Sequence, residues 1–354
     1  MISKKAAGIV PYTAGEQPRD KRYIKLNTNE NPYPPSGKVV SALLSADISR
    51  LRLYPDPASS ALKAAAAEKF GLKPENIFCG NGSDEILAFC FQAFFDPMGK
   101  DVIFPDVTYS FYPVWCKLFD INFRTPPLKA DFSVETNDYI SQKNCQGIVI
   151  ANPNAPTGRA LDLKDLEKVI AANADKAVVI DEAYVDFGGD SAIPLVKKYK
   201  NLVVVRTFSK SYGLAGMRIG FAAADKELID ALRRIKDSFN SYPVDFLAET
   251  AAVAALSDKE YFKAQANKVI KTRQAFCERI GAAGFSYIPS SANFVFVTHK
   301  TVTAEKLYKE LKESGVLVRW FNKPRISNYL RITIGTDEDM LICAEKLIEL
   351  ADKR

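Results

Sequence analysis

Short apolar runs alternate with amphipathic segments through the middle of the chain. The runs have the continuous apolar pattern of buried strands, and the expected strands end near Phe104, Ile150, Ile180 and Val205. Residues 162–172 and 226–239 carry their apolar side chains on one face, as amphipathic helices do, and another helix is expected from about residue 85 to residue 95. This alternation predicts a mostly parallel sheet covered by helices.

The pattern changes towards the C-terminus. A long helix is expected over residues 258–280, and the other expected elements are strands at 294–298, 316–321 and 330–334 and helices at 304–314 and 337–350. A chain of 354 residues is too long for one ordinary core. We therefore expect an α/β fold with a large domain at residues 31–245 and a smaller α+β domain that contains residues 246–354.

Composition is that of an ordinary soluble globular protein, with 47% hydrophobic and 25% charged residues. No run of 18 apolar residues occurs, so no transmembrane helix is expected. Residues 1–17 lack the apolar core of a signal peptide. The six cysteines are scattered, and several stand in apolar segments, which is typical of reduced core residues in a cytoplasmic protein.

The net charge of +6 comes from 48 basic and 42 acidic residues spread along the chain. Nucleic-acid binding would need a clustered basic face, so we expect neither nucleic acid nor a membrane as partner. The mild positive charge suits small anionic substrates. The single histidine, His299, argues against a histidine-based triad and against a metal site built on several imidazoles, so no metal is expected.

The most informative segment is residues 207–218, directly after an apolar run. It places Lys210 beside the hydroxyls of Thr207 and Ser209, with Arg218 one loop further on. A lysine held out of water beside fixed cations loses affinity for its proton and becomes a nucleophile that can form a Schiff base. Hydroxyls and an arginine are the donors that a phosphate needs. Pyridoxal phosphate carries an aldehyde and a phosphate and would use both sets of groups, although an isolated Ser-Lys pair is more often solvated.

A carboxylate stands at the end of a second expected strand. Asp181 follows the apolar residues 177–180, and the carboxyl end of a strand in an α/β protein faces the crevice where ligands bind. The ring nitrogen of pyridoxal phosphate needs an acidic partner, so Asp181 and Lys210 together carry more weight than either residue alone. By itself, Asp181 is equally compatible with a capping role.

Two more segments fit the same ligand. Residues 80–85 place glycines before an expected helix, where backbone N–H groups and the helix dipole favour an anion. Alone, this segment is typical of a turn with an N-cap. Residues 152–158 follow an expected strand and, alone, are typical of a proline-rich turn.

Together these segments resemble the aspartate-aminotransferase superfamily of pyridoxal-phosphate enzymes, of fold type I, and within it the histidinol-phosphate aminotransferases. The resemblance covers nearly the whole chain, in order, and further matching segments are residues 26–33, 53–57, 108–112, 181–184 and 330–335. It implies pyridoxal phosphate as cofactor and a seven-stranded sheet in the large domain. It also implies that residues 1–30 fold back onto the small domain.

The resemblance implies a role for each matching residue. Lys210 forms the Schiff base and later moves the proton between the substrate Cα and the cofactor C4′, Asp181 holds the proton of the ring nitrogen, and Tyr184 donates to the ring's phenolic oxygen. Residues implied to contact the ring or phosphate are Gly82, Ser83, Asp84, Tyr109, Thr207, Ser209 and Arg218. Tyr54 would reach the neighbouring subunit's cofactor phosphate, in a homodimer with shared active sites.

Substrate recognition is implied to rest on arginines. Arg331 matches the position that pairs with a carboxylate, and Arg319 matches one that meets the substrate phosphate. Tyr12 and Asn29 match positions near the same end. Simpler interpretations stay open. Tyr109 and Tyr184 are also compatible with positions in a hydrophobic core, and Arg319 is also compatible with an exposed position on an edge strand. Arg325 is a nearby competitor for the phosphate.

One position departs from the family pattern. Most relatives carry asparagine immediately before the Pro-Thr-Gly, where it hydrogen-bonds the cofactor's phenolic oxygen, but here that position is Ala155. Asn154 or Asn152 would have to supply the amide through a small shift of the turn, and we favour Asn154. If neither amide reaches the ring, Tyr184 makes that contact alone.

The implied reaction is transfer of an amino group between L-histidinol phosphate and 2-oxoglutarate, by a ping-pong scheme, in histidine biosynthesis. Two alternatives share the superfamily: an aminotransferase for aromatic amino acids and a phosphothreonine-type decarboxylase. A third is a non-catalytic regulator, which would carry an added DNA-binding segment. We do not expect that one, since the stretch before Leu26 is too short for a helix-turn-helix domain.

Overall fold

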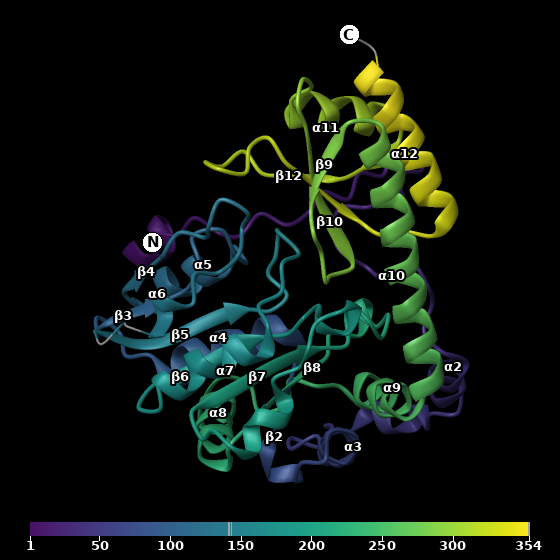
Figure 1. Ribbon diagram of the computed structural model, residues 1–354. Helices are drawn as coiled ribbons and strands as arrows, with labels where there is room; N and C mark the ends of the chain where they lie inside the picture. The colour runs from purple at the N-terminus through teal and green to yellow at the C-terminus, as the bar shows by residue number, and fades with distance from the viewer. Residues whose placement is uncertain (141, 143, 353–354) are drawn as a thin grey trace.

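A seven-stranded sheet forms the centre of the computed structural model, which describes residues 1–140, 142 and 144–352 (Figure 1). In spatial order its strands are β2 (Ile77–Gly80), β8 (Gly220–Ala224), β7 (Leu202–Thr207), β6 (Ala177–Asp181), β5 (Cys145–Ala151), β3 (Asp101–Ile103) and β4 (Phe123–Arg124). Only β8 runs against the others among these strands. The predicted mostly parallel sheet of seven strands is confirmed.

Helices cover both faces of this sheet. Val178 and Ile180 of β6 join one core, with α3 (Ser60–Phe70), α7 (Leu163–Ala172) and α9 (Phe246–Ser257). The intervening Val179 joins the opposite core, with α4 (Gly82–Phe94), α5 (Tyr112–Leu118) and α8 (Lys226–Phe239). Strands buried on both faces have continuous apolar sequences, which explains why the apolar runs located them.

A smaller α+β unit contains an antiparallel sheet of four strands. In spatial order these are β12 (Arg319–Trp320), β13 (Leu330–Thr333), β10 (Phe294–His299) and β9 (Phe285–Ile288). Three helices pack with it around a separate core, namely α10 (Lys259–Ala282), α11 (Ala304–Glu313) and α12 (Asp337–Asp352). The long helix α10 runs from beside α9 up to the small sheet (Figure 1). The predicted smaller α+β part is confirmed.

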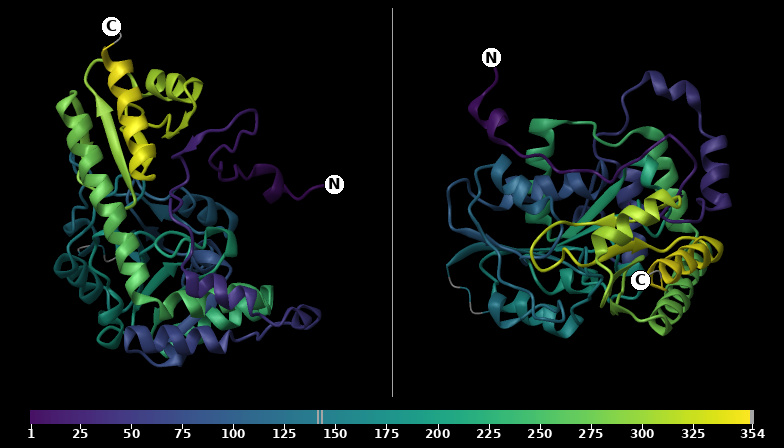
Figure 2. Two further views of the ribbon diagram at one scale, coloured as in Figure 1. Left: turned by 90° about the vertical axis from the view of Figure 1, so that its right-hand side faces the viewer. Right: turned by 90° about the horizontal axis from the view of Figure 1, so that it is seen from above.

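The N-terminal segment connects the two parts. It contains α1 (Lys4–Gly8) and β1 (Ile24–Lys25), and β1 pairs in parallel with β11 (Val316–Leu317) of the small part. Then α2 (Gly37–Leu44) packs against α9. Figure 2 shows this stretch crossing the face of the molecule. The pairing supports a boundary near residue 30, and the domain limits stay a prediction.

The single strand expected at residues 316–321 is wrong in one respect. The chain there forms two short strands with different partners, because β11 pairs with β1 whereas β12 pairs with β13. The apolar pattern is continuous across both, so it cannot reveal the change of partner. The helix expected from about residue 85 begins earlier, at Gly82.

The remaining elements are short. They are α6 (Asn137–Ile140) and the 3₁₀ helices at Ile48–Arg52, Pro74–Asn76, Val185–Phe187, Ile193–Lys197 and Ala215–Met217. The six cysteines are all buried and free. Across the described residues, no helix has both the length and the apolar character needed to cross a membrane.

Candidate active site

A cavity of about 290 Å³ opens where β5, β6 and β7 end. These strands contribute Ala151, Asp181 and Thr207 at their carboxyl ends, the usual place for a ligand in an α/β sheet. The predicted site residues that line it are Tyr12, Asn29, Ser83, Asp84, Tyr109, Asp181, Tyr184, Thr207, Ser209, Lys210, Arg218, Arg319 and Arg331. Segments far apart in the sequence therefore meet at one hollow.

Asp181 is a buried carboxylate without a cationic partner among the described residues. Its Oδ2 accepts a hydrogen bond from the Tyr112 hydroxyl at 3.0 Å, and its Oδ1 accepts one from the Ala183 N–H at 3.2 Å. Burial raises the pKa of Asp181 to about 6. A buried carboxylate of this kind gains most from a positively charged neighbour that binds in the cavity.

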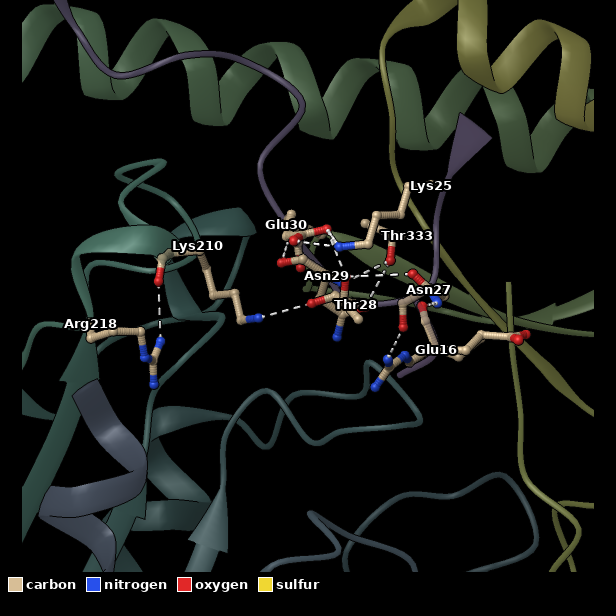
Figure 3. A network of polar contacts seen from close by, with 12 residues as sticks. Glu16, Lys25, Asn27, Thr28, Asn29, Glu30, Lys210, Arg218 and Thr333 are labelled. Carbon is tan, nitrogen blue, oxygen red and sulfur yellow. Dashed lines mark hydrogen bonds and ion pairs between the residues drawn. The ribbon is translucent and has the colours of Figure 1, made fainter. Parts of the chain in front are cut away.

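Lys210 lies in the loop after β7, with its amine in the same cavity. Its Nζ donates to the Thr28 carbonyl at 3.2 Å, an interaction seen in Figure 3. Burial lowers the pKa of Lys210 to about 8, and the positive charge of Arg331 acts in the same direction. At neutral pH a useful fraction of this amine is therefore unprotonated and nucleophilic.

The N-terminal segment also fixes the backbone of this lysine. The Asn31 Nδ2 donates to the carbonyls of Lys210 and Ser211, at 3.0 and 3.1 Å. Asp186 accepts from the Ser211 hydroxyl and from the buried Arg206. The loop that carries the Lys210 amine is thus hydrogen-bonded both to Asn31 and to Asp186.

An anion cradle lies at the N-terminus of α4. Gly82 has a φ of +80°, and a Cβ there would come within 2.8 Å of the Arg218 Nη2. Arg218 is exposed, and its Nη1 lies 3.4 Å from the Ser209 Oγ. Asp84 lies 3.7 Å from the Arg218 Nη2. Helix N–H groups, a serine hydroxyl and a guanidinium make a site for a phosphate.

Aromatic side chains border the cavity on the α5 side. The Tyr109 hydroxyl donates to the Asp84 Oδ1 at 2.8 Å, and its ring meets Tyr112 edge-on, with centroids 5.7 Å apart. Tyr12 stacks on Phe111, with centroids 4.2 Å apart. Tyr109 therefore presents a ring beside the cavity, as its predicted stacking role requires.

Arg331 has an unsatisfied donor. Its Nη2 donates to the Asn27 carbonyl at 2.8 Å, while its buried Nε has no hydrogen-bond partner among the described residues. An unpaired buried donor is costly unless a ligand satisfies it. Arg331 is thus suited to a carboxylate that accepts from the guanidinium.

A second cavity of about 280 Å³ adjoins the first and shares five lining residues with it, namely Tyr12, Tyr109, Ala155, Arg319 and Arg331. The cationic side chains that line it are Arg319, Lys323, Arg325 and Arg331. Arg319 donates to the Thr13 and Ala14 carbonyls, whereas Arg325 pairs with Asp106. This cavity is suited to an anionic group.

Three predicted cofactor residues do not line the first cavity. Gly82 lies beside Arg218 in the anion cradle, as described above. Asn154 is buried, and its amide bonds Val107, Thr108 and Thr157. Tyr54 is 83% exposed and stacks on Tyr242, with centroids 4.7 Å apart.

Ala155, and not Asn154, lines the cavity. Asn152 is likewise used locally, since it donates to the Leu161 carbonyl and accepts from the Leu161 N–H. Both amides thus hold the turn together. The favoured assignment of Asn154 to the cofactor stays a prediction without a supporting contact.

The family model described as "Aminotransferase class I and II" matches residues 21–347. The chain belongs to this family. A protein named histidinol-phosphate aminotransferase from Clostridium botulinum (strain 657) is 51% identical over 345 residues, 98% of this chain and 97% of that one. A protein of the same name from Brachyspira hyodysenteriae is 53% identical over 348 residues, with the same coverage.

A solved structure extends the comparison. The histidinol-phosphate aminotransferase from Sinorhizobium meliloti, in complex with pyridoxal-5′-phosphate, superposes with a TM-score of 0.85 at 25% identity. The match covers 94% of this aminotransferase and 91% of that chain. The enzyme is a pyridoxal-phosphate-dependent aminotransferase.

The cavity of this aminotransferase fits its cofactor on structural grounds. Asp181 offers buried negative charge for a ring nitrogen, and the lowered pKa of Lys210 suits attack on an aldehyde. The cradle of Gly82, Ser209 and Arg218 has the donors for a phosphate. The ring nitrogen, the aldehyde and the phosphate of the cofactor thus each have a matching group.

Several contributing residues were missed by the sequence analysis. Tyr112 bonds Asp181, Thr28 and Asn31 hold Lys210, and Lys323 lines the second cavity. Tyr112 and Thr28 stand inside segments that were recognised, but nothing in the pattern singled them out. Asn31 is separated from Lys210 by 179 positions, so only the folded chain reveals this contact.

Proposed function

We propose that the enzyme transfers an amino group between L-histidinol phosphate and 2-oxoglutarate in histidine biosynthesis. The observation that carries the proposal is the cationic second cavity, which adjoins the cavity lined by Lys210 and suits a phosphorylated substrate. Relatives named histidinol-phosphate aminotransferase, which are about half identical over nearly the whole chain, support the same assignment. The reaction would run as two half-reactions, with the amino group held by the cofactor in between.

Bound pyridoxal phosphate supplies an electron-withdrawing ring that stabilises negative charge at the substrate Cα. Lys210 would hold the cofactor through its aldehyde carbon, and its amine, once displaced by the substrate's amino group, would move a proton between the substrate Cα and the cofactor C4′. Asp181 holds the proton on the ring nitrogen, and Tyr112 keeps that carboxylate in place. Tyr109 covers one face of the ring.

In this proposal, different cationic side chains bind the carboxylate and the phosphate of the substrates. Arg331 binds a carboxylate of glutamate or 2-oxoglutarate through its unpaired Nε. Arg319 and Lys323 hold the phosphate of histidinol phosphate. Tyr12, which lines both cavities, closes the pocket from the N-terminal side.

We further propose that the enzyme works as a cytoplasmic homodimer with shared sites. Exposed large apolar side chains gather in and around residues 44–54, namely Leu44, Ile48, Leu51, Leu53 and Tyr54. In Figure 2 this stretch projects from the body of the subunit. Burying such a patch against a second copy would remove it from water, and would bring Tyr54 to the neighbouring cofactor phosphate.

A single-turnover experiment tests the proposed reaction. The cofactor-loaded enzyme is mixed with histidinol phosphate, phenylalanine or phosphothreonine, and the loss of the cofactor's aldehyde absorbance is followed. We expect the fastest loss with histidinol phosphate. Faster loss with phenylalanine would favour an aromatic aminotransferase, and release of carbon dioxide from phosphothreonine without any oxo acid would favour a decarboxylase.

A further inference from the structure

Asn29 connects a strand of the small sheet to the tyrosine of the cofactor cavity. Its Nδ2 donates to the Tyr184 hydroxyl at 3.0 Å, and its Oδ1 accepts from the Thr333 hydroxyl of β13 at 3.0 Å. Asn29 is only 1% exposed. Figure 3 shows the contact between Asn29 and Thr333 beside Lys210. The sequence had suggested only that Asn29 lies near the substrate.

The direction of these hydrogen bonds is set by Thr333. Its Oγ1 already accepts from the Asn29 backbone N–H at 3.0 Å, so its own proton is free to go to the Asn29 Oδ1. The amide then presents its NH₂ group to Tyr184, which is the direction seen in the structure. The tyrosine oxygen is an acceptor in that contact, which leaves its O–H proton available to the cavity.

We propose that Asn29 is a positioning residue that makes Tyr184 a hydrogen-bond donor to the cofactor's ring oxygen. This inference rests on the proposed cofactor site. The contact matters in this chain because Ala155, which has no amide, lines the cavity, and the Asn154 amide is engaged elsewhere. Tyr184 then supplies the donor for that oxygen, and its orientation depends on Asn29.

Charged groups also act on the Tyr184 hydroxyl. Arg331 of β13 favours its ionised form, whereas Asp181 of β6 and Asp84 of α4 oppose it, and burial raises the pKa of Tyr184. The Lys210 amine lies 5.7 Å from the centre of the Tyr184 ring. None of these groups directs the hydroxyl proton, because none of them is hydrogen-bonded to Tyr184. The Asn29 amide is the group that does so.

The backbone allows Asn29 to be tested cleanly. Its φ is +55°, a left-handed conformation that asparagine and glycine adopt readily. Asn29→Gly therefore removes the amide and keeps the turn, whereas alanine would add strain. Tyr184→Phe removes the hydroxyl itself and keeps the ring, which packs edge-on against Phe294.

The readout is the pH midpoint of the bound cofactor's absorbance change. A donor to the ring oxygen stabilises negative charge there and so favours the deprotonated form. We expect the midpoint to rise by about one pH unit in Tyr184→Phe and by about half a unit or more in Asn29→Gly. In the double variant Asn29→Gly should add nothing, because its effect passes through the tyrosine.

Three further variants distinguish positioning from a general loss of structure. Thr333→Ser keeps the hydroxyl and should keep the wild-type midpoint, whereas Thr333→Val frees the amide to turn and should raise it. Ala155→Asn in the Asn29→Gly background offers a new donor and should bring the midpoint back down.

Each outcome has a defined meaning. An unchanged midpoint in Asn29→Gly, or an equal rise with and without the Tyr184 hydroxyl, would overturn the role of Asn29. A wild-type enzyme that takes up no pyridoxal phosphate would instead overturn the proposed function, so the two failures are distinguishable.

Discussion

The amine of Lys210 donates to the backbone carbonyl of Thr28, 182 positions away in the sequence. This contact ties the nucleophile to the N-terminal segment that also reaches β11 of the small sheet. Burial and the charge of Arg331 lower the pKa of the same amine to about 8. The free enzyme thus holds its lysine in place and ready to react before a cofactor binds.

The first prediction concerns the pH dependence of cofactor capture. Only the unprotonated amine attacks an aldehyde, so the rate at which the apoenzyme takes up pyridoxal phosphate should rise with pH and level off above about pH 8. Stopped-flow absorbance between pH 6 and about 10.5, the pKa of an ordinary lysine, measures this rate. A rate that keeps rising up to pH 10.5 would show that the amine is not perturbed.

The second prediction concerns Asp181. Its pKa is raised to about 6 by burial, so the folded apoenzyme binds a proton that the unfolded chain releases near pH 4, and stability falls as pH rises from about 4 to 6. Asp181→Asn removes this loss of stability, because asparagine does not ionise. At pH 7 the variant apoenzyme should be more stable by about 1–3 kcal/mol, while transamination falls roughly a hundred-fold or more.

Denaturant unfolding of the two apoenzymes at pH 4 and pH 7 measures the effect on stability. The difference between them should be small at pH 4 and larger at pH 7. If the wild-type and variant apoenzymes were equally stable at both pH 4 and pH 7, Asp181 would be well solvated.

A third prediction addresses the phosphate cradle. Gly82→Ala places a Cβ within 2.8 Å of Arg218 at a φ of +80°, so it should strain the turn and raise the dissociation constant for pyridoxal phosphate about tenfold. Gly37→Ala is a matched control, because its Cβ would meet nothing within 4 Å. Equal affinities in both variants would remove Gly82 from the cofactor site.

The arginines give a fourth prediction, in which each variant mainly weakens a different substrate. Arg331→Lys loses the fork that pairs with a carboxylate, so the KM for glutamate should rise tenfold or more. Arg319→Ala should weaken histidinol phosphate far more than glutamate. Steady-state kinetics with both substrates gives the comparison, and equal losses on both substrates in either variant would contradict the division of roles.

Much of the site could be predicted from the residues that follow the expected strands. Asp181 and Lys210 were predicted because each follows an apolar run. Ligands of α/β proteins bind at the carboxyl ends of the parallel strands. The pattern could not give contacts between distant segments, such as Thr28 with Lys210 or Tyr112 with Asp181. Nor could it show that β11 and β12 have different partners, because strand pairing is a property of the folded chain and not of the local sequence.

The position of Ala155 shows a second limit. The departure from the family was visible in the sequence, but its consequence was not. Whether Asn154 turned towards the ring or into the loop depended on Val107 and Thr157, which the fold brings to it.

The most direct test identifies the residue to which the cofactor is bound. The enzyme is loaded with pyridoxal phosphate, reduced with borohydride and digested, and the peptides are analysed by mass spectrometry, with Lys210→Ala as control. We expect a single labelled peptide carrying the cofactor on Lys210, and no such label in the variant. A label on another lysine, or unchanged labelling and activity in Lys210→Ala, would contradict this expectation.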